Sequence, residues 1–147
     1  MSLPGREADR PARGHRDLPH TADIRIEAWG PTREACLAEA VAALTEAFAD
    51  TTGAVARRTA EADLDAETGE DALVAVLDEV IYLLEVAEVV PLGAEIEQRA
   101  GGLRLRMDVA ALHDAEITGA VPKAVSLHGL RLGRDAGRWS CTATIDV

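Results

Sequence analysis

Alternating apolar and polar residues predict a strand near each end of the chain. Residues 24–29 follow this pattern, with Ile24, Ile26 and Ala28 on one side. The last nine residues, 139–147, alternate in the same way over their whole length. Because successive side chains of a strand point to opposite faces, Asp146 lies on the polar face of the last strand and Asp23 on that of the first.

Helical spacing of apolar residues predicts two helices between these strands. The first begins at Thr32, a good N-cap residue after Gly30-Pro31, and ends near residue 50. The second covers residues 68–88 and starts with Thr68 and Asp71, an acidic form of the capping box. A broad apolar stripe follows this second helix: Leu73, Val76, Leu77, Val80, Ile81 and Leu84.

The remaining segments favour strands. Residues 57–64, 94–99, 103–110 and 123–132 have strand patterns, and Ala100-Gly101-Gly102 is a hairpin turn between two of them. A loop is expected over residues 112–122 and a turn over 133–137. The order of elements predicts an α+β fold, a single domain with two amphipathic helices packed on a largely antiparallel sheet.

Composition indicates where the folded domain begins and in which cellular compartment the protein is expected. Residues 1–13 are polar and contain Arg6, Arg10 and Arg13, so we expect a disordered tail followed by one domain over residues 14–147. The most apolar stretch, residues 72–90, is interrupted by four acidic residues, which argues against a membrane span. Cys36 and Cys141 fit no metal spacing and resemble small core residues, and an intracellular, cytoplasmic location is the default for such a chain.

The net charge and the absence of known catalytic motifs reduce the number of functional classes that fit this sequence. The formal net charge is −11 and aromatic residues make up only 3% of the chain. Phosphate binding needs basic residues and single-strand binding needs exposed aromatic faces, so a basic protein partner or a cation fits better than nucleic acid. The sequence has no phosphate-binding glycine motif, no zinc-protease motif and no nucleophile elbow, which argues against a free-standing enzyme.

Candidate chemistry comes from carboxylates near the two chain-end strands. If these strands are neighbours, Asp23, Asp146 and the terminal carboxylate of Val147 can converge as oxygen ligands for Ca²⁺ or Mg²⁺. Pattern alone favours the simpler alternative, in which Asp23 caps a turn and Asp146 is a solvated strand end. His20 is a metal ligand, an acid–base group or a turn residue. Lys123 and His128 lie on opposite faces of one strand unless a bulge intervenes.

Three motifs together resemble the archease family. They are His20-Thr21-Ala22-Asp23 before a strand that ends in Trp29-Gly30, the segment PKAVSLHGL at 122–130, and the ending Thr144-Ile145-Asp146-Val147. The resemblance covers residues 14–147. The chain departs from the family pattern at Gly129, where many members have glutamate, and at residues 84–88, where the family often has an Asp-Thr-Glu-Gly-like turn.

The resemblance implies a function that the residues alone do not. Archease proteins are accessory factors of the RNA ligase that joins 2′,3′-cyclic phosphate or 3′-phosphate ends to 5′-hydroxyl ends, and they promote its guanylation and multiple turnover. By resemblance, Asp23, Asp146 and Val147 would bind a divalent metal ion (Ca²⁺, Mg²⁺ or Mn²⁺), and Lys123 would be a further functional residue, with His20 and His128 as additional candidates.

The favoured interpretation is therefore a non-enzymatic ligase activator in the tRNA-splicing and RNA-repair class, which contacts nucleic acid only through the ligase. The alternatives are a chaperone-like adaptor for RNA-modifying enzymes and, more distantly, a small metal-dependent hydrolase.

Overall fold

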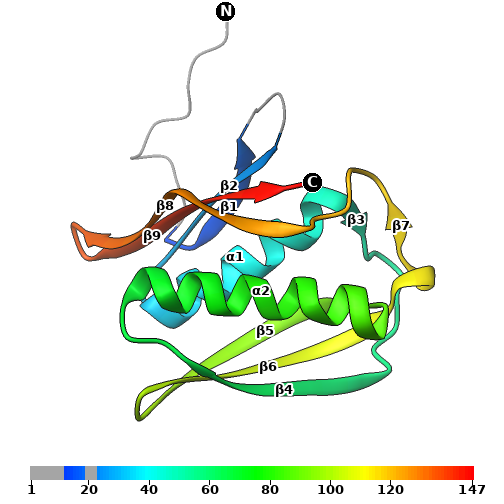
Figure 1. Cartoon of the computed structure of the whole chain (residues 1–147), viewed down its shortest axis with the longest axis horizontal. Coiled ribbons are helices and arrows are strands. Elements are labelled where there is room, and N and C mark those ends of the chain that lie inside the picture. Colours follow the sequence, from blue (N-terminus) through cyan, green and yellow to red (C-terminus); the bar gives the residue numbers. More distant parts are fainter. Residues whose placement is uncertain (1–11, 19–22) are drawn as a thin grey trace, which may run out of the picture.

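Two antiparallel sheets enclose the helices α1 and α2 (Figure 1). The computed structural model describes residues 12–18 and 23–147, so residues 1–11 of the expected tail lie outside the described part of the chain. The helices are α1 (Arg33–Phe48), α2 (Gly69–Ala87) and a 3-10 turn, η2 (Leu112–Asp114). The strands are β1 (Gly14–Leu18), β2 (Ile24–Gly30), β3 (Ala49–Asp50), β4 (Arg58–Asp65), β5 (Val89–Arg99), β6 (Gly102–Ala111), β7 (Glu116–Ile117), β8 (Ala124–Asp135) and β9 (Arg138–Asp146).

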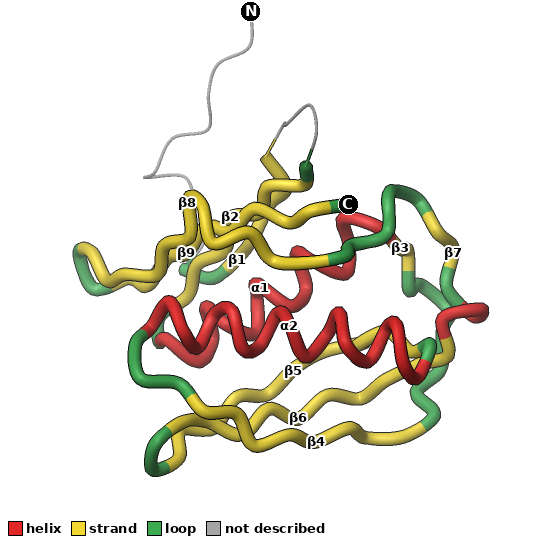
Figure 2. The backbone as a smooth tube through the Cα atoms, in the orientation of Figure 1, coloured by secondary structure: helices red, strands yellow, loops and turns green. Residues whose placement is uncertain are grey.

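The strands form two larger sheets and one short pair. The first sheet has the order β1-β2-β9-β8, the second has the order β4-β6-β5, and β3 pairs with β7. Figure 2 shows the helices as a layer between the two larger sheets. The predicted α+β fold with helices packed on antiparallel sheet is confirmed, and the structure adds that the strands are divided between two sheets.

Helix α1 is buried on most of its circumference because it has a sheet on either side. It packs against β2 of the first sheet and β5 of the second, and its buried residues include Leu37, Val41, Leu44 and Phe48. A helix covered on both sides needs apolar residues all round, and the many alanines of α1 let both sheets approach closely. Both predicted N-caps are present: Ala35 N–H donates to Thr32 Oγ1 at 3.0 Å, and Thr68 forms a capping box in α2.

Strand β1 is absent from the sequence prediction. It is an edge strand that pairs with β2, placing His15 opposite Ala28 and Asp17 opposite Ile26. The residues that face α1 from β1 are therefore charged or polar, so the strand has no apolar alternation. Inward-pointing charged residues are a known way to protect a sheet edge from pairing with another chain.

Turns and strand starts also differ in detail from expectation. The β8–β9 turn is shorter than predicted, since only Ala136 and Gly137 separate the strands, both with positive φ (52° and 76°) as a two-residue hairpin turn requires. Strand β5 begins at Val89, well before residue 94. Helix α2 ends at Ala87, the C-cap residue Glu88 adopts a left-handed conformation, and the chain then enters β5 directly.

The two cysteines meet in the core. Cys36 Sγ donates to the Ala28 carbonyl at 3.6 Å, and Ala28 is paired with Cys141 across β2 and β9. Both thiols are buried and unoxidised, as predicted for core residues. The hydrogen bond with Cys36 and burial raise the pKa of the Cys141 thiol, so this thiol is unsuited to nucleophilic chemistry. Within residues 12–18 and 23–147, no helix has the length and apolar character needed to cross a membrane.

Candidate functional site

The register between β2 and β9 brings Asp23 next to Asp146. These strands are antiparallel neighbours, and the pair at this end of their ladder is Ile24 with Ile145. One residue further along both strands, Asp23 and Asp146 occupy the next cross-strand position. Directly opposed residues in an antiparallel pair have Cα atoms only ~4.5–5.5 Å apart, so their side chains share one face of the sheet.

That face points away from the core. Ile145 is fully buried and Ile24 packs against the same core cluster, so alternation directs the neighbouring aspartates outward. Asp146 is exposed, while Asp23 and Val147 are half-buried. Val147 follows Asp146 directly and lies at this same end of the sheet. Such an all-oxygen donor set fits a hard cation such as Ca²⁺ or Mg²⁺.

Lys123 reaches the same end of the sheet from β8. Its backbone N–H donates to the Asp146 carbonyl at 2.8 Å, and Ala124 pairs with Asp146 in the first position of β8. Figure 1 shows the chain end, marked C, beside the segment that leads into β8. Lys123 is exposed, so a cationic side chain starts close to the candidate carboxylates.

His128 does not join this group. Regular β8–β9 pairing stops at Ser126 and resumes at Arg131, so the bulge that would change the facing of His128 is present. Five residues of strand nevertheless separate His128 from Lys123, roughly 16 Å at the usual rise. His128 is exposed, and its backbone N–H donates to Ser126 Oγ at 3.1 Å. His20 lies outside the described residues.

A metal-binding role remains a prediction for these residues. Within the described part of the chain, no three or more His, Cys, Asp or Glu side chains form a group suited to a metal ion. The predicted site has only two such side chains, Asp23 and Asp146, and its third donor is the chain terminus.

Comparison with known proteins identifies the family. The sequence model of the Archease protein family matches residues 15–147. A probable protein archease of Mycobacterium tuberculosis is 43% identical over 134 residues, which cover 91% of this chain and 75% of that protein. The chain belongs to the archease family. A protein archease of Methanosarcina barkeri is 30% identical over 141 residues, covering 88% of this chain and 93% of that protein.

Solved archease-like structures share the fold. The solution structure of protein 1598 from Methanobacterium thermoautotrophicum aligns with a TM-score of 0.71 at 22% identity, covering 91% of this chain and 99% of that one. The crystal structure of a Thermotoga maritima archease, described as a possible chaperone, aligns with a TM-score of 0.63 at 24% identity, covering 88% and 94%. At these identities the likeness supports the shared architecture.

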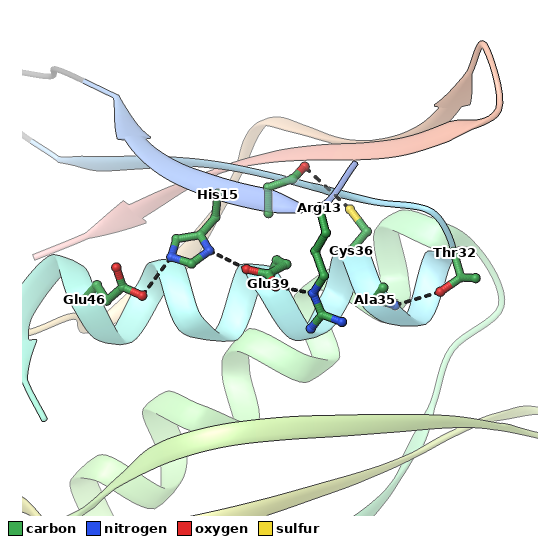
Figure 3. Close-up of polar contacts among 8 residues, drawn as sticks. Arg13, His15, Thr32, Ala35, Cys36, Glu39 and Glu46 are labelled. Carbon is green, nitrogen blue, oxygen red and sulfur yellow. Dashed lines mark hydrogen bonds and ion pairs between the residues drawn. The ribbon is translucent and has the colours of Figure 1, made fainter. Parts of the chain in front are cut away.

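A second polar cluster, which the sequence patterns do not predict, ties β1 to α1 (Figure 3). His15 Nδ1 lies 2.5 Å from Glu39 Oε1 and His15 Nε2 lies 2.7 Å from Glu46 Oε2, so two carboxylates hold both ring nitrogens. Arg13, which precedes β1, forms an ion pair with Glu39 of α1. The seven-residue spacing of Glu39 and Glu46, two helical turns, is the sequence signal that places both on one helix face.

The surroundings of His15 favour its charged form. Burial alone lowers the pKa of the imidazole, but the hydrogen bonds and charges of Glu39 and Glu46 outweigh it, and the net shift raises the pKa above its usual value. Burial, followed by repulsion from Glu46, also raises the pKa of Asp17. The contacts between β1 and α1 in this cluster are therefore strongest when His15 is protonated.

His15→Gln is expected to destabilise the protein in a pH-dependent way. A raised folded-state pKa contributes stability that is fully present below about pH 6.5 and is lost as the pH rises through the folded pKa. With partly exposed partners, we expect a loss of about 1–2 kcal/mol near pH 6 and a smaller loss near pH 9. Urea unfolding at both pH values measures the difference.

Arg16→Gln is the matched control on the same strand. Arg16 pairs with Glu27 at 2.9 Å in a contact that involves no histidine. Its deficit should therefore be the same at both pH values. An equal deficit for His15→Gln at the two pH values would show that protonation of His15 does not stabilise the contact.

Proposed function

We propose that this protein is a metal-binding accessory factor that activates an RNA ligase of the 3′-phosphate/5′-hydroxyl joining type, promoting its guanylation and multiple turnover. Membership of the archease family supports an accessory role. The observation that carries the proposal is the β2–β9 register, which gives Asp23 and Asp146 adjacent positions on one face.

Opposed carboxylates make physical sense when a cation is shared between them. Like charges directly opposite one another on a sheet repel, and a shared cation reduces that repulsion. Asp23, Asp146 and the Val147 carboxylate would hold a divalent ion, which would supply positive charge near the triphosphate that the ligase uses. Lys123 would contribute a further positive charge at the edge of the same group.

The charge of the chain suits a protein partner. With a net charge of −11 it does not need to grip RNA, and contact with nucleic acid would be made by the ligase. Such a factor would act in the cytoplasm and would have no catalytic activity of its own. A chaperone-like adaptor role, favoured by the description of the Thermotoga maritima relative, is the second candidate.

Ligase guanylation tests the proposal directly. Purified ligase of the same organism is mixed with GTP and Mg²⁺ or Mn²⁺, with and without this protein, and formation of the guanylated ligase is followed over time. We expect faster guanylation and more than one ligation per ligase molecule when the protein is present. Equal rates with and without it would overturn the activator role, and hydrolysis of phosphoesters by the protein alone would favour the hydrolase.

A further inference from the structure

A groove of about 510 Å³ lies between α2, the β4–α2 connection and β8. Its apolar lining comes from the first half of α2 and from β8, as Val74, Ala75, Leu127 and Leu130. Its acidic lining consists of Asp65, Glu67, Asp71 and Asp78, and no lysine or arginine lines it. The groove lining therefore combines apolar and acidic side chains.

The walls of the groove are fixed by the fold. The Glu70 carboxylate accepts the Leu132 backbone N–H at 3.1 Å, which ties the first turn of α2 to β8. Thr68 and Asp71 close the same turn with reciprocal capping bonds. A partner would therefore meet a surface that needs little ordering on binding, which lowers the entropic cost of association.

The β8 bulge presents Leu127 to solvent. Pairing with β9 is interrupted between Ser126 and Arg131. Gly129 has a φ of 74° within the bulge, and its carbonyl accepts Thr142 Oγ1 at 3.3 Å. Leu127 is 75% exposed, so most of the ~1.5–3 kcal/mol that burying a leucine can provide is unused in the isolated chain.

Charge selects the kind of occupant. A second copy of this chain would bring the same four acidic residues and a net charge of −11 against the first. RNA or an anionic membrane would also meet these four carboxylates. A basic protein segment has the complementary charge. Addition of a strand to β8 is disfavoured because the bulge breaks the row of edge hydrogen-bonding groups.

We propose that this groove docks a basic amphipathic segment of a partner protein. Aliphatic side chains of the segment pack on Leu127 and Leu130, and its lysines or arginines face Asp65, Glu67 and Asp78. The identification of that partner as the RNA ligase rests on the function proposed above. Leu127 lies three residues along β8 from Ala124, the partner of Asp146, and the usual rise of a strand makes this separation roughly 10 Å. One protein could contact both.

A synthetic helical peptide of lysine and leucine probes the groove independently of the ligase. The ¹⁵N-labelled full chain is titrated with this peptide and with a glutamate–leucine peptide of equal length. We expect the lysine peptide to shift the amide signals of Val74, Ala75, Leu127 and Leu130, and the glutamate peptide to leave them unchanged. Shifts spread evenly over the acidic surface, or centred elsewhere, would overturn the groove as a docking site.

Matched variants distinguish binding in the groove from nonspecific attraction of the basic peptide to the acidic surface. Leu127→Ser and the double variant Glu67→Lys/Asp78→Lys should each weaken peptide binding at least ~10-fold, since central apolar anchors and facing charges dominate such contacts. The controls are Val55→Ser, another highly exposed apolar residue (71%), and Glu116→Lys, an exposed acid on β7. Equal affinity of Leu127→Ser and the wild-type chain would contradict the proposal. Thermal melts confirm that each variant is folded.

The ligase arm tests the identity of the partner. The protein concentration that gives half-maximal stimulation of guanylation should rise at least ~10-fold in the groove variants and stay unchanged in the two controls. An unchanged concentration in the groove variants would exclude the ligase as occupant. If the wild-type chain does not stimulate the ligase at all, the proposed function fails, while the peptide titration still decides the groove.

Discussion

Replacing Asp23 and Asp146 together by asparagine will abolish the acceleration of ligase guanylation. Both side chains keep their size and lose their charge, so the strands β2 and β9 remain paired while the oxygen site loses two negative ligands. Affinity of such sites varies over decades with the number of charged ligands, so each single variant should bind Mn²⁺ at least ~10-fold more weakly. Guanylation assays and titration calorimetry measure the two effects.

Thermal unfolding gives a readout that does not depend on the ligase. A cation at 100 times its dissociation constant adds about 2.7 kcal/mol to the stability of the folded state, roughly 5–10 °C in Tm for a domain of this size. The wild-type chain should show this increase and the double variant should lose it. Without metal, the difference in Tm between the double variant and the wild-type chain measures what the two aspartates contribute to folding by themselves.

Controls assign the effect to this end of the sheet. Asp135→Asn removes an exposed carboxylate at the opposite end of β8 and should leave the metal-dependent increase in Tm unchanged. Extending the chain beyond Val147 displaces the terminal carboxylate and should weaken metal binding. An unchanged affinity in the extended chain would show that the terminus is not a ligand, and an unchanged Tm increase in the double variant would contradict the whole site.

Local pattern predicted the strands that carry the candidate carboxylates but not their pairing. Alternation placed Asp23 and Asp146 on polar faces, because facing is a property of each strand alone. The β2–β9 register joins the two ends of the chain, and no local signal encodes it. The resemblance to archease motifs favoured one site, and the structure shows the neighbouring positions that such a site requires.

Three features depend on contacts between distant parts of the chain and were not predictable from local sequence patterns. Strand β1 lacks an apolar period because His15 faces the carboxylates of α1. The bulge around Gly129 has no local signal of its own, because a glycine after a histidine does not show where strand pairing is interrupted. The groove beside Leu127 combines residues from β4, α2 and β8, and its lining follows from the division of the strands between two sheets.

Leu44→Ala should be among the most destabilising single substitutions in this chain. Leu44 is fully buried on α1, with the two sheets on either side of its helix. Truncation removes apolar contacts and leaves a cavity that two fixed sheets cannot easily fill, so we expect a loss of about 2–5 kcal/mol in the free energy of unfolding. Urea unfolding followed by circular dichroism measures it, and the slope of the transition shows whether unfolding stays two-state.

Leu127→Ala is the matched comparison, since the same side chain is truncated at a site that is 75% exposed. Its cost should stay within about 0.5 kcal/mol, as for other surface substitutions. A loss comparable with that of Leu44→Ala would mean that Leu127 is buried in solution, and its assignment as an exposed apolar residue of the groove would then be wrong. A near-neutral result means that this leucine contributes little to folding, so a weaker complex of its variants with a basic partner can be attributed to the lost contact itself.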